Sequence, residues 1–425
     1  MRKDTNIFPN KGVVIIGIIV ILSVLPLSGQ SFKFGYTWLG ENLEEIINAT
    51  MGNIGPFRYD ATFSLAPRYS SDIFFGQGQN PVPDYIFSAS PNLSIFLPFK
   101  NGIVFDISDT PNYVFYFNTE RERTLNNTFQ ARVHLAFDMF YFQFGTELTN
   151  ARQRWSTEAF FNVRRKVNNF TGLAFWQISE SSALELQHQF SKFEYDSPSG
   201  LNIDWFGLSR LERLSVLKAY YKELKRMRFF ISAEHGAYAF KESISFQRNA
   251  LSYGVSGGIE FKPLVEDSEK TRTFQGQIQL GYKYFDVIDP HEIDFKGLVG
   301  STRFSINILK FTALRVMFSR SINFSIYSDL NYYISTSIGA GIERFITKKI
   351  LAFYNFSFSL NDYVQSEESS FSQANRRFLS HDFSITFLMK GNIGLEVLAG
   401  IEERSIDRTR QIYRRYFMGF NLTWH

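Results

Sequence analysis

Apolar and polar residues alternate along this chain with a period of two, from Phe57 to the C-terminus. In the first such segment, FRYDATFSL, Arg58 and Asp60 share one face with two hydroxyl residues, and apolar side chains occupy the other. Period two predicts β-strands with one apolar and one polar face. After residue 30 no uncharged apolar stretch reaches 18 residues, whereas a membrane-spanning helix needs about 20. This part of the chain can therefore cross a bilayer only as strands.

The aromatic content distinguishes a soluble sheet from one embedded in lipid. Phe, Tyr and Trp make up 17% of the 425 residues, yet the mean hydropathy is slightly negative at −0.15. Lipid-facing and lumen-facing residues of a membrane barrel cancel in such an average, and aromatic side chains gather at both interfaces. A soluble sandwich also has one apolar face per strand, but the alternation covers more chain than one sandwich holds. The sequence predicts an all-β, antiparallel, up-and-down transmembrane β-barrel.

Other features exclude several functional classes. The absence of cysteine excludes disulfides and thiol chemistry, and a net charge of +4 gives no nucleic-acid footprint. The histidines form no HxxxH or HxH pair, and neither GxSxG nor GxxxxGK[ST] occurs. His381 and Asp382, next to Ser380, are adjacent in a predicted strand and so face opposite sides. We expect no enzyme, no catalytic residue, no cofactor and no metal.

The N-terminal region has a separate character. Residues 1–29 combine a basic start, an uncharged apolar run of 15 residues from Val13 to Leu27, and small residues before Gln30. These features predict a cleaved signal peptide, and a retained anchor is the alternative. In the segment 30–56, apolar residues recur at helical spacing between Glu41 and Asn53. This short helix could lie in the periplasm, plug the lumen or pack against the lower rim.

The remaining residues, 57–425, are predicted to form the barrel. Short links such as 179–182 alternate with long polar links such as 361–376, and in outer-membrane barrels these are periplasmic turns and extracellular loops. Counting on this basis gives eighteen strands, with sixteen as the alternative. The predicted strands are 57–68, 84–97, 103–118, 126–138, 141–149, 156–177, 183–195, 204–222, 228–240, 249–262, 272–285, 294–309, 312–321, 330–346, 349–360, 376–389, 393–403 and 411–424.

The last predicted strand ends on alternate apolar residues that close with Trp424, followed by His425. This pattern is similar to the C-terminal signal that the barrel-assembly machinery reads. A last strand that pairs with the first would remove the open edge of the sheet. The expected partners therefore include this machinery and outer-membrane lipid, and the expected location is the outer membrane of a Gram-negative-type bacterium.

The inward face of such a barrel carries its function, because a barrel of about eighteen strands encloses an aqueous channel. The polar faces mix both charges with amides and hydroxyls, which suits an uncharged or weakly charged polar substrate such as a glycan. Ordinary lumen polarity explains the same residues without a specific site. The lumen-facing candidates are Arg58, Asp60, Arg132, His134, Asp138, Gln275, Gln277, Gln279, Lys283, Arg315 and Glu396.

Several stretches resemble the putative β-barrel porin family 2, whose members are outer-membrane barrels linked to exopolysaccharide export. The similarity lies in FSLAPRYSSDIFFGQGQNPVPDYIFSASPNLSIFLPF, in IVFDISDTPNYVFYFNTERERTLNN, in the turn QISESSAL that starts at Gln177, in FKGLVG from Phe295, and in the pair Tyr332 and Tyr333. The resemblance implies a pore that gives a polysaccharide its exit and works with a periplasmic polysaccharide-export protein. It transfers no functional residue. A general or solute-selective porin and a structural or adhesive barrel are the other hypotheses.

Overall fold

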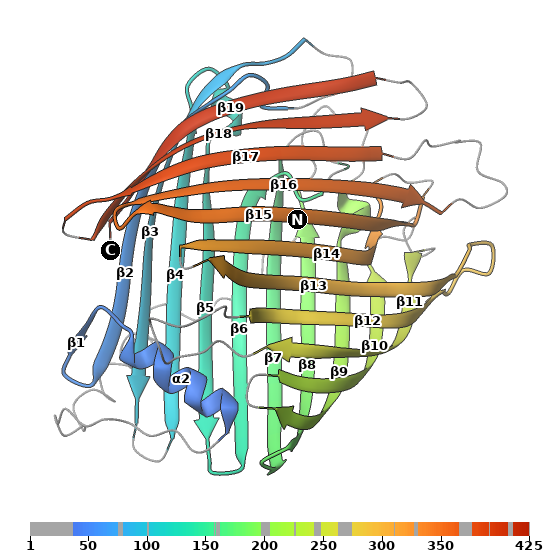
Figure 1. The fold of residues 1–425 in the computed structure, drawn as a ribbon. Coiled ribbons are helices and arrows are strands. Elements are labelled where there is room, and N and C mark those ends of the chain that lie inside the picture. The colour runs from blue at the N-terminus through green and yellow to red at the C-terminus, as the bar shows by residue number, and fades with distance from the viewer. Residues whose placement is uncertain are drawn as a thin grey trace, which may run out of the picture.

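The chain closes into a single antiparallel β-barrel in the computed structural model (Figure 1). The structure describes residues 37–74, 80–99, 102–156, 158, 162–196, 205–224, 227–241, 248–261, 274–309, 311–326, 330–364, 376–390, 392–406 and 411–424. Each of the strands β2 to β19 pairs with the next along the chain, and β19 pairs back onto β2. These eighteen strands form the wall, and the short strand β1 is an addition to it.

The wall strands are long enough to cross a bilayer at a tilt, which needs about 9–11 residues each. They are β2 Phe57–Ser70, β3 Asp84–Pro98, β4 Ile103–Tyr116, β5 Thr124–Ala136, β6 Phe140–Gln153, β7 Val163–Ser179, β8 Ser182–Tyr195, β9 Arg210–Leu224, β10 Met227–Phe240, β11 Ala250–Phe261, β12 Phe274–Val287, β13 Phe295–Leu309, β14 Thr312–Phe324, β15 Tyr332–Thr347, β16 Ile350–Tyr363, β17 Arg376–Leu388, β18 Ile393–Ile406 and β19 Gln411–Trp424. The other elements are helix α2 Trp38–Asn48, strand β1 Gly52–Ile54, and the 3-10 turns η1 Glu120–Glu122 and η2 Trp205–Leu208.

The predicted strand number of eighteen is confirmed, and the alternative of sixteen is wrong. Most boundaries agree within a few residues. The clearest correction concerns the sixth strand, which was predicted to begin at residue 156, whereas β7 begins at Val163. The helix predicted from Glu41 to Asn53 is α2, three residues earlier at its start and five at its end. Residues 1–29, the predicted signal peptide, lie outside the described residues.

The outer face of the wall is the apolar one. In β19, for example, Met418, Phe420 and Trp424 are 62%, 52% and 56% exposed, and their polar neighbours point the other way. Such side chains would be unstable in water but are stable against lipid. In the described part of the chain, no helix is long and apolar enough to cross a membrane. The strand faces predicted from the sequence are therefore the faces that the fold uses.

The seam between β19 and β2 shows how the chain protects its ends. Their register runs from Phe417 opposite Ser70 to Trp424 opposite Phe63, which confirms the predicted closure. The first residues of β2 extend past the end of β19. There β1 pairs with β2, with Gly52 opposite Tyr59 and Ile54 opposite Phe57. Strand β1 therefore covers an edge that would otherwise leave backbone groups unpaired.

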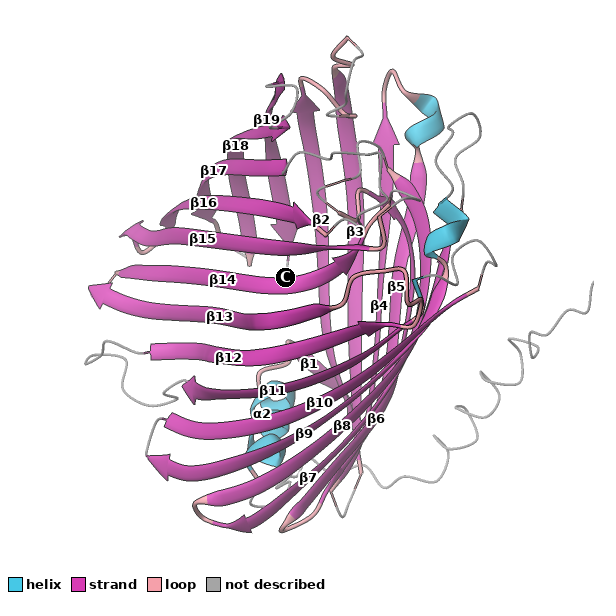
Figure 2. Ribbon diagram, turned by 90° about the vertical axis from the view of Figure 1, so that its right-hand side faces the viewer, coloured by secondary structure: helices cyan, strands magenta, loops and turns pink. Residues whose placement is uncertain are grey.

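Helix α2 precedes β1 and lies near the end of the barrel that carries the short turns (Figures 1 and 2). Thr37 caps its first turn, because its hydroxyl accepts a hydrogen bond from the Gly40 amide at 3.2 Å. Leu43 and Ile47 are four residues apart and so share one face of the helix. Both side chains are buried, which fixes the face that α2 turns to the wall.

Candidate functional site

The inner face of the wall is identified by contacts that only the interior of a closed barrel permits. The Arg154 guanidinium, just after β6, lies 3.3 Å from the Glu402 carboxylate of β18, and these strands are not neighbours in the sheet. Leu43 and Ile47 of α2 belong to the same buried cluster as Tyr141. The pairing register between neighbouring strands then identifies the inward residues of all the remaining strands. This face contains the candidates predicted from the sequence, with the exception of Asp138.

The predicted candidates fall into separate places. Arg58 and Asp60 lie on β2 opposite Phe96 and Ser94, and Glu396 of β18 accepts a hydrogen bond from the Asn421 amide at 3.4 Å. Asp138 does not lie in the wall at all: it is part of the short turn between β5 and β6. The short turn ends the strand earlier than the alternation suggested, so the assignment of Asp138 to the lumen wall is not retained.

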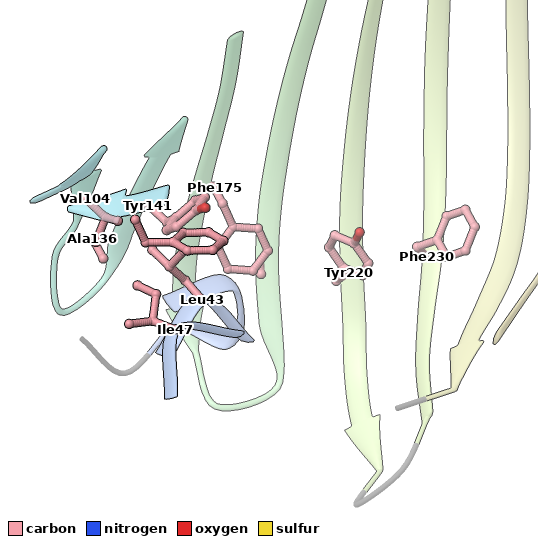
Figure 3. Packing of buried hydrophobic residues seen from close by; sticks show 10 residues of the cluster. Leu43, Ile47, Val104, Ala136, Tyr141, Phe175, Tyr220 and Phe230 are labelled. Carbon is pink, nitrogen blue, oxygen red and sulfur yellow. The ribbon is translucent and has the colours of Figure 1, made fainter. Parts of the chain in front are cut away.

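At the short-turn end, α2 packs against the inner wall of the barrel (Figure 3). Leu43 and Ile47 meet a collar of inward side chains that is apolar. The collar consists of Phe96, Val104, Ala136, Tyr141, Phe175, Ala183, Tyr220 and Phe230. One collar residue lies on each of the strands β3 to β10, close to their periplasmic turns. Because Leu43 and Ile47 are both buried in this contact, α2 lies inside the lumen. The sequence alone had left the lumen, the periplasm and the lower rim as alternatives.

Arg132 and His134 lie beside α2 and share one carboxylate. Their side-chain nitrogens both approach the Asp106 carboxylate at 3.7 Å, and the His134 Nδ1 atom lies 2.7 Å from the Tyr141 hydroxyl. A cavity of about 320 Å³ opens between these strands and α2, with Leu43 on its helix side. The cavity thus offers one apolar surface and one polar surface with paired charges.

Across the lumen, the predicted glutamines form part of a hydrogen-bonded row. The Gln277 amide donates to Gln279 at 3.1 Å, and Gln279 donates to the Ser256 hydroxyl at 2.7 Å. Gln275 continues the same face of β12. Lys283, further along this strand, pairs with Glu234 of β10 at 2.5 Å, and Gln279 and Lys283 both line a cavity of about 260 Å³.

The intervening strand β11 makes the pair of Lys283 and Glu234 possible. Gly254 lies between them and is opposite both residues in the sheet. Because glycine has no side chain, the Lys283 ammonium reaches across β11 to the carboxylate of β10. The remaining basic candidate, Arg315 of β14, is also paired, with the Glu343 carboxylate of the neighbouring strand.

At the long-loop end, the link between β6 and β7 turns inward and reaches the far wall. We call its described residues 154–156 and 158 the crossing segment. Besides the Arg154 contact with Glu402, the Glu158 carboxylate accepts hydrogen bonds from the Ser325 hydroxyl at 2.9 Å and from the Ile326 amide at 3.0 Å. These residues follow β14. The crossing segment therefore narrows the lumen.

Glu158 is completely buried in this contact. Arg404 of β18 donates to the Glu158 backbone carbonyl at 2.9 Å. Burial raises the pKa of the Glu158 carboxyl above its usual value, while the amide of Ile326 and the hydroxyl of Ser325, which donate to it, act in the opposite direction. Burial therefore makes the charged form of Glu158 less favourable here than it is in water.

Residues 154–158 were missed because the sequence alternation there was read as the start of a long strand. Trp155 explains where the chain leaves the wall. Its indole nitrogen donates to the Val163 carbonyl at 2.9 Å, and the Arg165 guanidinium lies 3.3 Å from the centre of its ring. Strand β7 begins only after this contact. The tryptophan that follows Arg152 and Arg154 is the one sequence signal that could have suggested an inward turn.

The described residues were compared with the metal-site and hydrolase patterns considered from the sequence. No group of three or more His, Asp and Glu side chains there could hold a metal ion. His381 points outward, with its Nδ1 atom 2.8 Å from the Tyr354 hydroxyl, and Asp382 points inward, where it accepts from Ser380 at 3.1 Å. The predicted separation of this pair is confirmed.

Helix α2 provides a test of the lower lumen. The double substitution of Leu43 and Ile47 by alanine is expected to release α2, because each truncation of a buried aliphatic side chain costs about 2–5 kcal/mol. Amide hydrogen exchange over residues 38–48 would then become fast while the wall stays protected. Ile46→Ala is the matched control, since that side chain is 53% exposed. Slow exchange in the double variant would show that other contacts hold the helix.

The chain was compared with known proteins and solved structures. No curated protein matches the chain. Among solved structures, the chain is similar to OpdK of Pseudomonas aeruginosa at 10% identity and a TM-score of 0.48, covering 86% of this chain and 98% of that one. OccAB3 of Acinetobacter baumannii is similar at 9% identity and a TM-score of 0.48, covering 86% of this chain and 98% of that one. The FrpB iron transporter of Neisseria meningitidis is similar at 8% identity and a TM-score of 0.45, covering 85% of this chain and 64% of that one.

The family comparison is more specific. The model of the family described as putative beta-barrel porin 2 matches residues 146–423, well over half of the chain. The match includes the stretches that begin at Gln177 and Phe295 and the pair Tyr332 and Tyr333, whereas the similarity noted before residue 146 lies outside it. Together with the closed barrel, the family indicates an outer-membrane channel rather than an enzyme. The chain belongs to the putative beta-barrel porin 2 family.

Proposed function

We propose that this porin is a selective channel for polar solutes without large net charge, with saccharides as the best-fitting class. The pairing of charges on the lower and middle lumen wall carries this proposal. Opposite charges pair at four places on this wall. The pairs are Asp106 with Arg132, Glu234 with Lys283, Glu343 with Arg315, and Lys218 with both Glu185 and Glu260. Neutralised pairs attract neither anions nor cations strongly. The amides and hydroxyls between them can both donate and accept, as sugar hydroxyls do.

The inward elements favour a solute-selective porin over a wide pore. Helix α2 occupies one side of the lumen at the periplasmic end, and the crossing segment spans it at the extracellular end. A solute must pass both. Selection by size and by hydrogen bonding at these two places is therefore expected, as in other channels with narrowed lumens.

Export of an exopolysaccharide is the second candidate. The family resemblance favours it, and the hydrogen-bonding wall suits a sugar polymer as well as a small sugar. In this version the barrel receives the polymer from a periplasmic polysaccharide-export protein, and the crossing segment must move aside for the chain to leave. The protein would reach the outer membrane by means of a cleaved signal peptide, residues 1–29.

Two measurements separate the candidates. Liposomes containing the purified full-length protein are expected to swell in isosmotic small sugars faster than protein-free liposomes. A deletion strain should then retain its surface polysaccharide. Loss of surface polysaccharide without sugar-dependent swelling would instead support export. If neither property changes while adhesion of cells does, a structural or adhesive barrel is favoured and the channel proposal is wrong.

A further inference from the structure

The cavity between α2 and the wall has a polar side and an apolar side, which come from different elements. Strands β3, β4 and β5 supply the polar side, and Leu43 and Ile46 of α2 line the opposite side. The volume of about 320 Å³ falls within the range of pockets that hold small molecules, about 300–1,000 Å³. The Ile46 side chain is exposed, so a solute in the aqueous lumen can reach it.

The polar side consists of side chains that lie in register across the three strands. Ser94 of β3 is opposite Ser108 of β4, and Ser108 is opposite Gln130 of β5. The hydroxyls of Ser94 and Ser108 are half-buried and form no hydrogen bond with any residue in the described part of the chain. Each can therefore donate one hydrogen bond to a ligand in the cavity and accept others from it.

The neighbouring polar residues are held in place by bonds among themselves. The Thr110 hydroxyl donates to the side-chain carbonyl of Asn92 at 2.8 Å, which leaves the amino group of Asn92 for a ligand. The Gln130 amide donates to Glu147 at 2.7 Å, and its carbonyl accepts from Arg132. Because these side chains are already fixed, a ligand that binds them causes a smaller loss of conformational entropy.

The apolar side distinguishes between classes of polar solute. Leu43 and Ile46 form this side, and Phe96 of β3 adds an aromatic ring at its edge. A pyranose ring matches such a cavity, because it has C–H groups on its faces and hydroxyl groups around its rim. An open-chain polyol has the same hydroxyl groups but no flat apolar face. The cavity therefore favours a sugar ring over a polyol of equal polarity.

We propose that this cavity is a binding subsite for one saccharide ring, formed jointly by α2 and the strands β3, β4 and β5. The inference rests on the proposed function and gives it a location at the periplasmic end of the lumen. One face of the ring packs against Ile46. The ring hydroxyls exchange hydrogen bonds with Ser94, Ser108 and Asn92. Helix α2 is thus part of the recognition site and does more than narrow the lumen.

Saturation-transfer NMR titrations of the purified full-length protein in detergent micelles test the subsite, with glucose and the open-chain polyol sorbitol as probes. The native protein is expected to bind glucose several-fold more tightly than sorbitol. Ser94→Ala combined with Ser108→Ala should raise the Kd for glucose about tenfold, because two neutral hydrogen bonds are lost.

The matched control is Ser337→Ala combined with Ser359→Ala. These serines are also opposite each other on the inner face, in β15 and β16, which contribute no residue to the collar. This control should leave the Kd for glucose unchanged. If it weakens glucose binding as much as the cavity variant does, sugars bind the whole wall and the subsite is wrong.

Ile46→Ala tests the apolar side independently, because it leaves the buried face of α2 intact. It should weaken glucose binding about fivefold, through loss of apolar contact, and leave sorbitol binding unchanged. Equal binding of glucose and sorbitol by the native protein, or native affinity in both cavity variants, would overturn the inference. Swelling of liposomes in sugars would then leave the proposed channel function intact. Liposomes that swell in no sugar would instead defeat the proposed function itself.

Discussion

Replacing Glu158 with alanine is expected to release the crossing segment from the far wall and to raise the single-channel conductance severalfold. The variant loses the hydrogen bonds from Ser325 and Ile326 and leaves both buried donors without their acceptor. Such a loss costs about 2–4 kcal/mol, enough to make the undocked arrangement common. Conductance in planar bilayers measures the change directly.

Two further variants make this result specific. Glu120→Ala removes an exposed carboxylate of another extracellular link, where it pairs with Arg123 at 3.1 Å, and should leave conductance unchanged. Glu158→Gln keeps a neutral acceptor oxygen and should remain docked. Because burial raises the pKa of Glu158, docking is strongest below the usual glutamate pKa and weakens as the pH rises through the raised value. Native conductance should therefore increase with pH, whereas the glutamine variant should not respond. Unchanged conductance in Glu158→Ala would contradict the assigned role.

Phe420→Arg is expected to prevent stable assembly of the barrel, whereas Asn421→Arg should be tolerated. The two positions are neighbours on β19, but Phe420 is 52% exposed on the outer face and Asn421 contacts Glu396 inside. An arginine against lipid near the middle of a bilayer costs about 2–4 kcal/mol. In this strand the cost adds to weakened closure against β2. Inside, the same charge lies near a carboxylate.

The measurement is the fraction of heat-resistant, protease-protected barrel recovered in outer membranes or after refolding into lipid vesicles. A large loss in Phe420→Arg beside near-native recovery in Asn421→Arg would confirm the two faces of the seam strand. Equal recovery of both variants would show that β19 does not face lipid at this level. Equal loss would indicate that any added charge in this strand blocks closure.

Much of the barrel could be predicted because strand periodicity is a local property. Alternation reports which side of each strand meets lipid, and link lengths report which end of the barrel each turn occupies. The strand number, the antiparallel order and the inward candidates on β2, β5, β12 and β14 followed from these signals. The error at the start of β7 arose where alternation continued although the backbone had left the wall. Periodicity cannot distinguish a strand from an extended segment that binds elsewhere.

Contacts across the lumen could not be predicted from the sequence pattern, because they join residues that are far apart in the chain. Arg154 and Glu402 are 248 positions apart, and Ser325 is 167 positions from Glu158. Closure of the barrel brings them together, because the circumference set by eighteen strands fixes which walls face one another. The same holds for α2, whose amphipathic face was evident but whose position depended on the apolar collar assembled from eight strands.

The sequence by itself therefore determined the architecture, the location in a membrane and the polar character of the interior, since each depends on neighbouring residues along one strand. Only the tertiary structure decided where the lumen narrows and which charges neutralise one another. Those properties depend on distances between strands that are far apart in the chain, and such distances exist only once β19 has paired with β2.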